Sequence, residues 1–251
     1  MITLMGFRPR GPETAPAGAR LAAIPARRAH SRRRMDGATL LLDLVLIAVA
    51  YLCGSIPIGV VVARLTGGVD PRTVGSGRTG GTNALRALGR RRAAVVVAGD
   101  VLKGALPVLL ARYTVGGAFI ESLCAIATVA GAIWSVFVGF RSGRGVGTGV
   151  GTMLVIQPLA VLIAFPVFVA AILITRYVSL GSLLGSAAIA IALFVMWAVA
   201  NGSISGAYLL YAVAGAALVW LAHADNIDRL MHGTERKFDL SALRGGGASE
   251  G

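Results

Sequence analysis

The stretch "TLLLDLVLIAVAYLCGSIPIGVVVARL", residues 39–65, is almost uninterrupted by charge. Asp43 and Arg64 are its two charged side chains, and Leu, Val, Ile and Ala make up most of the remainder. About 20 apolar residues are enough for a helix to cross the hydrocarbon core of a bilayer. Three arginines at 32–34 precede the stretch as in a signal peptide, but the apolar run continues beyond signal length. The stretch therefore predicts a helix embedded in a membrane.

The composition of the whole chain supports the same interpretation. Of its 251 residues 56% are hydrophobic and 14% are charged, whereas about 25% of residues are charged in soluble domains. The net charge is +13, but no nucleic-acid-binding module is visible, so anionic lipids or phosphorylated substrates are the expected partners rather than nucleic acid. We predict an all-α, polytopic integral membrane protein with about seven transmembrane helices. The predicted apolar segments are 39–65, 93–112, 118–140, 145–157, 158–175, 178–200 and 205–222. The fourth is short and glycine-rich, so it is the doubtful span, and a half-helix buried in protein is the alternative.

Positive charge is concentrated in alternate connections between these segments. The connections after the first, third and fifth segments and the end of the chain carry most of the arginines, while the other connections carry only Arg112, at a helix end. Arginine-rich connections face the cytoplasm. Seven spans place all of these connections on one side, whereas six spans would break the alternation. The sequences "VGSGRTGGTN", "GFRSGRGVGTG", "TRYVSLGS" and "HADNIDRLMHGTERK" are therefore expected to converge at one membrane surface.

The two ends of the chain are expected to lie outside the membrane domain. Residues 1–38 are rich in Pro, Gly, Ala and Arg without hydrophobic periodicity, which predicts a disordered extension. Met35 directly precedes the first apolar segment, so we hypothesise that it is the true start. We assign 39–240 to the membrane domain and 241–251 to a flexible tail.

Two of the converging sequences could bind anions. In the first, glycines at 75, 77, 80 and 81 expose backbone N–H groups next to Ser76, Thr79, Thr82 and Asn83, which suits a nest for phosphate oxygens. A flexible, solvated loop is an equally open interpretation. In the second, Arg141 and Arg144 lie three residues apart among glycines and could clasp a phosphate. By themselves these two arginines are explained as well by the membrane charge rule, and the glycines by close helix packing.

Polar residues near or inside the apolar segments give further candidates. Asp100 and Lys103 share a helix face within the second segment, as a structural ion pair or a substrate contact. His223 and Asn226 follow the last segment three residues apart, where a histidine can polarise a hydroxyl or simply end a helix. No cluster has metal-ligand spacing, and we expect neither metal nor cofactor.

Taken in order, several motifs resemble the bacterial acyl-phosphate:glycerol-3-phosphate acyltransferases. The resemblance runs from about Tyr51 to Phe238 and rests on "GSIPIGVVVARL", "GVDPRTVGSGRTGGTNALRALG", "DVLKG", "VFVGFRSGRGVGT", "TRYVSLGS" and "NIDRLMHGTERKF". It implies a seven-span enzyme of the bacterial plasma (inner) membrane that moves a fatty acyl group from acyl-phosphate to the 1-hydroxyl of sn-glycerol 3-phosphate. The products are lysophosphatidic acid and phosphate, in phospholipid biosynthesis. The family's active site faces the cytoplasm and uses no metal or acyl carrier protein.

The resemblance also implies roles for individual residues. The histidine, asparagine and serine of the family's last two motifs correspond to His223, Asn226 and Ser179, which are the expected catalytic residues. The expected substrate-binding residues are Ser76, Gly77, Gly80, Thr82 and Asn83 for phosphate, Arg141, Ser142 and Arg144 for the glycerol phosphate, and Lys103 and Glu235.

The chain also departs from the family pattern. Arg78 replaces an asparagine, Ala132–Ser135 replaces His-x-Phe-Pro, arginines replace the lysines of the second motif, and Ala224 replaces an arginine. Two other functions remain open at this point: a transporter or channel for an anionic solute, and a scaffold that binds anionic lipid. The sequence does not specify an oligomeric state.

Overall fold

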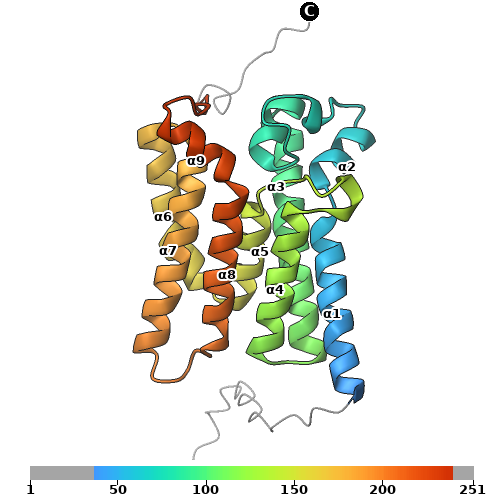
Figure 1. Cartoon of the computed structure of the whole chain (residues 1–251), viewed down its shortest axis with the longest axis vertical. Coiled ribbons are helices and arrows are strands. Elements are labelled where there is room, and N and C mark those ends of the chain that lie inside the picture. The colour runs from blue at the N-terminus through green and yellow to red at the C-terminus, as the bar shows by residue number, and fades with distance from the viewer. Residues whose placement is uncertain (1–36, 240–251) are drawn as a thin grey trace, which may run out of the picture. The chain divides into compact units, whose positions relative to one another are not determined.

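The structure is a computed structural model that describes residues 37–239 (Figure 1). Every regular element in this part of the chain is a helix, as predicted. The predictions for an N-terminal extension, for a start at Met35 and for a tail over 241–251 fall outside the described residues. The helices are α1 (Gly37–Ser55), α2 (Ile58–Leu65), α3 (Gly81–Thr114), α4 (Ala118–Ile133), α5 (Val146–Ile156), α6 (Pro158–Thr175), α7 (Val178–Val199), α8 (Ala207–Ala222) and α9 (Ala224–Met231), with 3-10 helices η1 (Pro71–Thr73) and η2 (Val136–Val138).

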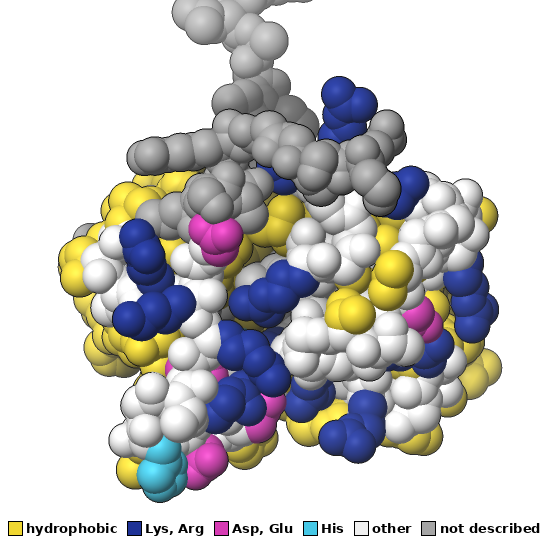
Figure 2. Space-filling model, turned by 90° about the horizontal axis from the view of Figure 1, so that it is seen from above, with side chains coloured by type: hydrophobic (Ala, Val, Ile, Leu, Met, Phe, Trp, Pro, Cys, Tyr) yellow, Lys and Arg dark blue, Asp and Glu magenta, His cyan; other side chains and the backbone are white. Residues whose placement is uncertain are grey.

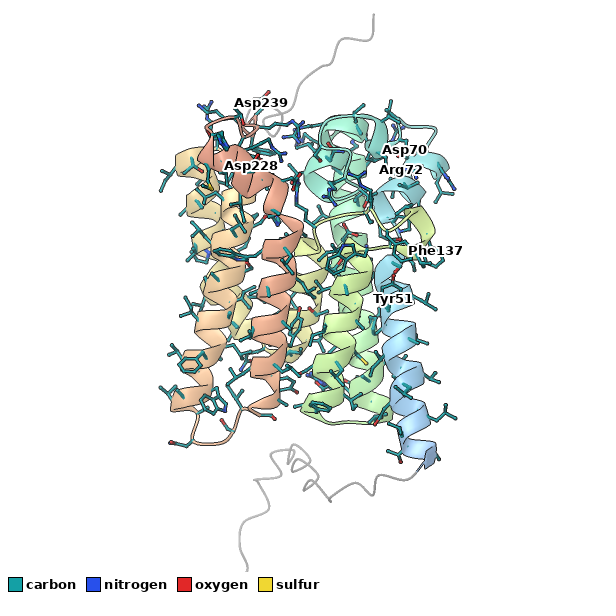
Figure 3. The ribbon with its side chains drawn as sticks, in the orientation of Figure 1. Tyr51, Asp70, Arg72, Phe137, Asp228 and Asp239 are labelled. Carbon is teal, nitrogen blue, oxygen red and sulfur yellow. The ribbon has the colours of Figure 1, made fainter. Side chains whose placement is uncertain are left out.

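The apolar helices run back and forth between two ends of the domain (Figure 1). Helices α1, α4, α6 and α8 run toward one end, and α3, α5 and α7 run away from it. That end carries α2, α9 and the connections that precede α3, α5 and α7, and we call it the site end. Figure 3 shows Asp70, Arg72 and Asp228 there. The glycine- and arginine-bearing connections therefore come together at one end, as the alternation of charge predicts.

Five stretches are long and apolar enough to cross a membrane: α1, α3, α4 continued to Val138, α6 and α7. Helices α8 and α9 meet at a bend of 61° and together bring the number to as many as six. The remaining apolar helix, α5, has 11 residues, about 16 Å at 1.5 Å per residue, which is short of the roughly 30 Å hydrocarbon core. Each of the seven predicted segments is thus largely helical, and the fourth is a short helix packed against α3, α4, α6 and α8.

A buried polar network joins the helix ends opposite the site end. The guanidinium of Arg112, at the end of α3, lies 2.6 Å from Glu121 Oε2 and donates to the Val155 carbonyl at 2.8 Å. The Tyr208 hydroxyl donates to the same carboxylate at 2.9 Å. The network ties α3, α4, α5 and α8 together. It also pairs the Glu121 carboxylate, which would be costly to bury alone within a membrane.

The first predicted segment, 39–65, is wrong as a single helix. The chain leaves the helix at Ile56 and Pro57, and α2 starts at Ile58. Proline has no N–H to donate and disfavours helical geometry in the residue before it. Lys103 Nζ donates to the Ile56 carbonyl at 2.9 Å, so the break serves as a polar attachment point for α3.

The second segment is also longer than predicted, because α3 begins at Gly81 rather than near residue 93. Gly89, at φ +76°, changes the helix direction after two turns, in a backbone region that other residues enter only with strain. The first part of α3 therefore belongs to the site end rather than to the membrane-spanning part.

Helices α3 and α5 pack with their backbones almost in contact. A Cβ at Gly151 would lie 2.0 Å from the Val101 carbonyl oxygen, and a Cβ at Gly104 would lie 2.2 Å from that of Thr148. Small residues allow such close approach of helices in membranes. This contact fixes the position of α5 and of the connection that leads into it.

Candidate functional site

A cavity of about 420 Å³ opens at the site end. Figure 2, which views this end, shows Lys and Arg side chains gathered around a hollow. The mouth is lined by polar residues of the connections, and the deeper wall by apolar side chains of α3, α5, α6, α7 and α8. The apolar wall includes Val101, Met153, Phe165, Phe168, Ile189 and Ala216. The cavity thus combines a polar, cationic mouth with an apolar interior.

Four helices begin at this cavity: α3, α5, α7 and α9. Their N-cap residues are Gly80, Gly145, Tyr177 and His223, and none of these four makes a side-chain capping hydrogen bond. The first N–H groups of a helix have no partner within it, and the helix dipole adds positive potential there. Convergent, uncapped N-termini make a strong binding environment for anions.

The glycine-rich loop before α3 is held together by Asn83. Its Oδ1 accepts from the Ser76 N–H at 3.0 Å, and its Nδ2 lies 2.6 Å from the Pro71 carbonyl and 2.9 Å from the Arg78 carbonyl. The side chain is 2% exposed. Asn83 therefore lines the cavity while its amide shapes the loop, and its contact with substrate stays a prediction.

Ser142 plays a similar supporting part. Its hydroxyl lies 3.0 Å from Thr79 Oγ1, and both residues are buried. This bond ties the glycine-rich loop to the connection between α4 and α5. It brings the two predicted anion-binding sequences side by side.

Glu235 organises the other side of the mouth. Its Oε1 accepts from Asn226 Nδ2 at 2.7 Å and from the Ser179 hydroxyl at 3.1 Å, and its Oε2 accepts from Arg229 Nε at 2.8 Å. Both carboxylate oxygens are thus engaged by the protein. Glu235 sets the orientation of the Asn226 amide and of the Ser179 hydroxyl toward the cavity.

Arg144 reaches the same region from the start of α5. Its Nη2 lies 3.1 Å from Asp225 Oδ2, which also lies 3.3 Å from Arg229 Nη2. Burial lowers the pKa of Arg144, Asp225 raises it, and the charges of Arg78 and Arg229 lower it further. Such a crowded set of cations would be stabilised by an added anion.

Polar atoms without a partner point to where a ligand would bind. Among the described residues, four buried side-chain polar atoms have no hydrogen-bond partner, and three of them belong to this region. They are Arg144 Nε, Asp225 Oδ1 and Asn226 Oδ1. Buried polar groups are nearly always paired, so these atoms are available for a ligand that offers both donors and acceptors.

His223 lines the cavity and is 2% exposed. Its Nδ1 lies 2.7 Å from the Val219 carbonyl oxygen, which can only accept, so Nδ1 carries the proton. In the neutral ring Nε2 is then a hydrogen-bond acceptor. His223 can therefore accept a hydrogen bond from a substrate hydroxyl.

Lys103 and Asp100 form the ion pair that their spacing suggested. Lys103 Nζ lies 2.8 Å from Asp100 Oδ1, and both residues line the cavity. With its bond to the Ile56 carbonyl, Lys103 is held mainly by the protein.

The structure brings most of the candidate residues together. Ten of them line the cavity, namely Ser76, Gly80, Thr82, Asn83, Lys103, Arg144, Ser179, His223, Asn226 and Glu235. Gly77, Arg141 and Ser142 do not, and the side chain of Arg141 is exposed. Arg86 and Arg236 are not among the candidate residues but also line the cavity. Arg86 lies one helical turn after Asn83, a spacing that places both on the same helix face and could have revealed it.

Among the described residues no group of three or more His, Cys, Asp or Glu side chains could hold a metal ion.

The chain is similar to known proteins over most of its length. The family described as "Glycerol-3-phosphate acyltransferase" matches residues 44–233. A glycerol-3-phosphate acyltransferase of Geobacter sulfurreducens is 41% identical over 196 residues, covering 78% of this chain and 97% of the relative. One from Clostridioides difficile is 42% identical over 199 residues, covering 77% and 94%.

Solved structures give the same result. Crystal structures of PlsY, an integral membrane glycerol 3-phosphate acyltransferase, in its glycerol 3-phosphate and lysophosphatidic acid forms, each match with a TM-score of 0.73 and 36% identity. The matches cover 81% of this chain and 98% and 100% of those chains. The chain therefore belongs to the glycerol-3-phosphate acyltransferase family.

Proposed function

We propose that this protein transfers a fatty acyl group from acyl-phosphate to the 1-hydroxyl of glycerol 3-phosphate in phospholipid synthesis, forming lysophosphatidic acid and phosphate. Glycerol-3-phosphate acyltransfer follows from family membership, while the acyl-phosphate donor is the finer part of the proposal. One observation carries it: a single cavity joins cations and four uncapped helix N-termini to an apolar wall. An amphiphilic phosphate and a small polar phosphate can meet in such a cavity.

The anionic ends of the two substrates have separate candidate sites. The glycine-rich loop and the N-terminus of α3 offer backbone N–H groups for the donor phosphate. Arg144 and the N-terminus of α5 offer a guanidinium and further N–H groups for the acceptor phosphate. A mixed anhydride is already activated, so positioning and charge stabilisation are the main tasks of the protein.

The hydroxyls of the acceptor fit the remaining polar atoms. His223 Nε2 and Asn226 Oδ1 are acceptors, and Glu235 fixes the second of them in place. The oxygen of the 1-hydroxyl bonds to the acyl carbon, the bond from that carbon to the phosphate oxygen breaks, and the hydroxyl proton ends on the departing phosphate. No residue has to form a covalent intermediate.

We also propose that the protein lies in the bacterial plasma membrane with the site end facing the cytoplasm. The support is the arginine content of the connections at that end, compared with Arg112 on the opposite side. The acyl chain would occupy the apolar wall of the cavity while the reacting groups stay at the mouth.

The test is turnover by the purified full-length chain in lipid nanodiscs, with palmitoyl-phosphate and glycerol 3-phosphate as substrates. We expect lysophosphatidic acid and phosphate in equal amounts, and much slower transfer from palmitoyl-coenzyme A. Transfer from the thioester alone would overturn the choice of donor. Failure to acylate glycerol 3-phosphate from either donor, in folded protein, would overturn the function.

A further inference from the structure

Arg78 differs from the other cations at the cavity. Arg144 and Lys103 are paired with carboxylates, and Arg86 and Arg236 are exposed at the mouth. Arg78 lines the cavity and is half-buried, yet it makes no ion pair with any residue in the described part of the chain. An unpaired guanidinium facing a cavity suits an anionic ligand better than a structural role.

The backbone of Arg78 is held on both sides. Its carbonyl accepts from Asn83 Nδ2 at 2.9 Å, and the next residue, Thr79, is buried and bonded to Ser142 at 3.0 Å. Gly77, just before it, has φ +67°, so the chain turns sharply into this position. The backbone of Arg78 is therefore held at the edge of the cavity that its side chain lines.

Arg78 lines the same cavity as the residues of both proposed substrate sites. It extends from the loop proposed for the donor phosphate, and its charge acts on Arg144, His223 and Asp225. The unpartnered atoms Arg144 Nε and Asn226 Oδ1 belong to the same region.

The chemistry of the substrates indicates whether the donor or the acceptor phosphate binds next to Arg78. The donor phosphate is attached directly to the carbon that the hydroxyl attacks, so it must lie beside the residues that hold that hydroxyl. The acceptor phosphate is separated from the 1-hydroxyl by the carbon chain of glycerol. The phosphate next to both His223 and the glycine-rich loop is therefore that of the donor.

We propose that Arg78 is a catalytic residue that binds the donor phosphate and stabilises it as it leaves. This inference rests on the proposed function. As the carbon–oxygen bond to phosphate breaks, the bonding electron pair remains with the phosphate and its negative charge grows. A guanidinium offers two parallel N–H groups to that charge, and preorganised donors of this kind are worth most where charge develops.

The test compares Arg78→Ala, Arg78→Gln and Arg78→Lys with Arg72→Ala. Arg72 is the matched control, because it lies in the same loop but is exposed and paired with Asp70 at 2.6 Å. We expect Arg78→Ala and Arg78→Gln to lower kcat/KM for palmitoyl-phosphate by about 100-fold, with the KM for glycerol 3-phosphate changed by no more than about twofold. Arg78→Lys should fall between them and wild type, and millimolar guanidinium ion should partly restore Arg78→Ala.

A binding measurement keeps this test separate from the test of function. Inorganic phosphate should bind the purified wild-type chain, as followed by phosphorus NMR, and bind Arg78→Gln about tenfold more weakly. Suppose that Arg78→Gln loses phosphate binding while the wild-type chain uses only palmitoyl-coenzyme A as donor. The assignment of the donor phosphate would then be wrong, but Arg78 would still be a phosphate ligand. Unchanged phosphate binding and unchanged kinetics in Arg78→Gln would overturn the proposal. So would an effect confined to the KM for glycerol 3-phosphate.

Discussion

The contact between α3 and α5 links the fold most directly to the site. Gly151→Ala would place a methyl group 2.0 Å from the Val101 carbonyl oxygen and 3.1 Å from the Ala105 nitrogen. Ordinary contact begins near 3.4 Å, so the two backbones must separate by at least 1.4 Å, the difference between 3.4 and 2.0 Å. No flexible side chain can yield, because the atoms in the way are backbone.

That separation has two measurable consequences. Overpacking of this kind costs roughly 1–3 kcal/mol of stability. It also shifts the start of α5, where Gly145 and Arg144 meet the cavity, and a shift of about 1 Å at a catalytic site can lower the rate about 100-fold. We therefore expect Gly151→Ala to lower both the unfolding temperature in detergent and the rate of acyl transfer.

Gly149→Ala is the matched control on the same helix. Its Cβ would lie 3.8 Å from the nearest atom, the Tyr211 hydroxyl, and alanine is favoured over glycine inside a helix by roughly 1 kcal/mol. We expect its unfolding temperature to equal or exceed that of wild type. If Gly151→Ala unfolds at the same temperature as Gly149→Ala and keeps the wild-type rate, the close packing does not position α5 and the reasoning is refuted.

Three further substitutions test the site and the network at the opposite end. His223→Ala should reduce kcat by about 100-fold through loss of the acceptor for the substrate hydroxyl, which steady-state kinetics can measure; a rate within threefold of wild type (about 0.7 kcal/mol) would remove it from the mechanism. Arg144→Ala should raise the KM for glycerol 3-phosphate far more than Arg141→Ala does, because Arg144 lines the cavity and Arg141 does not. Equal effects of the two substitutions on this KM would contradict the assignment of the acceptor phosphate to Arg144. Arg112→Ala should lower the free energy of unfolding by about 3–5 kcal/mol, since it leaves the buried Glu121 without its cation; thermal unfolding close to that of wild type would show the pair to be dispensable.

Sequence reasoning anticipated the parts of the fold that follow from composition and charge. Long apolar runs predicted the helices, and the distribution of arginine predicted which connections share an end. The first and last residues of each helix are harder to predict from the sequence, because they depend on local breaks in the helix. Pro57 ended α1 within a run that hydropathy alone treats as continuous, and Gly89 redirected α3 where the pattern suggested a loop.

Individual side-chain roles depended on contacts that no pattern records. Arg141 and Arg144 are equivalent by spacing, but Phe140 at φ +59° and Gly145 at φ +75° turn the connection so that only Arg144 lines the cavity. The amide of Asn83 is engaged by the loop backbone, a structural use that the motif alone does not indicate. Both cases depend on backbone conformation, which a single sequence does not determine.

In the proposed mechanism both substrates meet at one end of the domain, and the reaction, rather than transport, takes place there. The direct test uses sealed vesicles in which the orientation of the protein is set by labelling Arg141→Cys, an exposed position at the site end. Palmitoyl-phosphate is supplied in the membrane, and glycerol 3-phosphate is supplied on one side at a time. We expect lysophosphatidic acid only when glycerol 3-phosphate is on the labelled side. Product formed equally from both sides, or glycerol 3-phosphate accumulating inside without acylation, would contradict it.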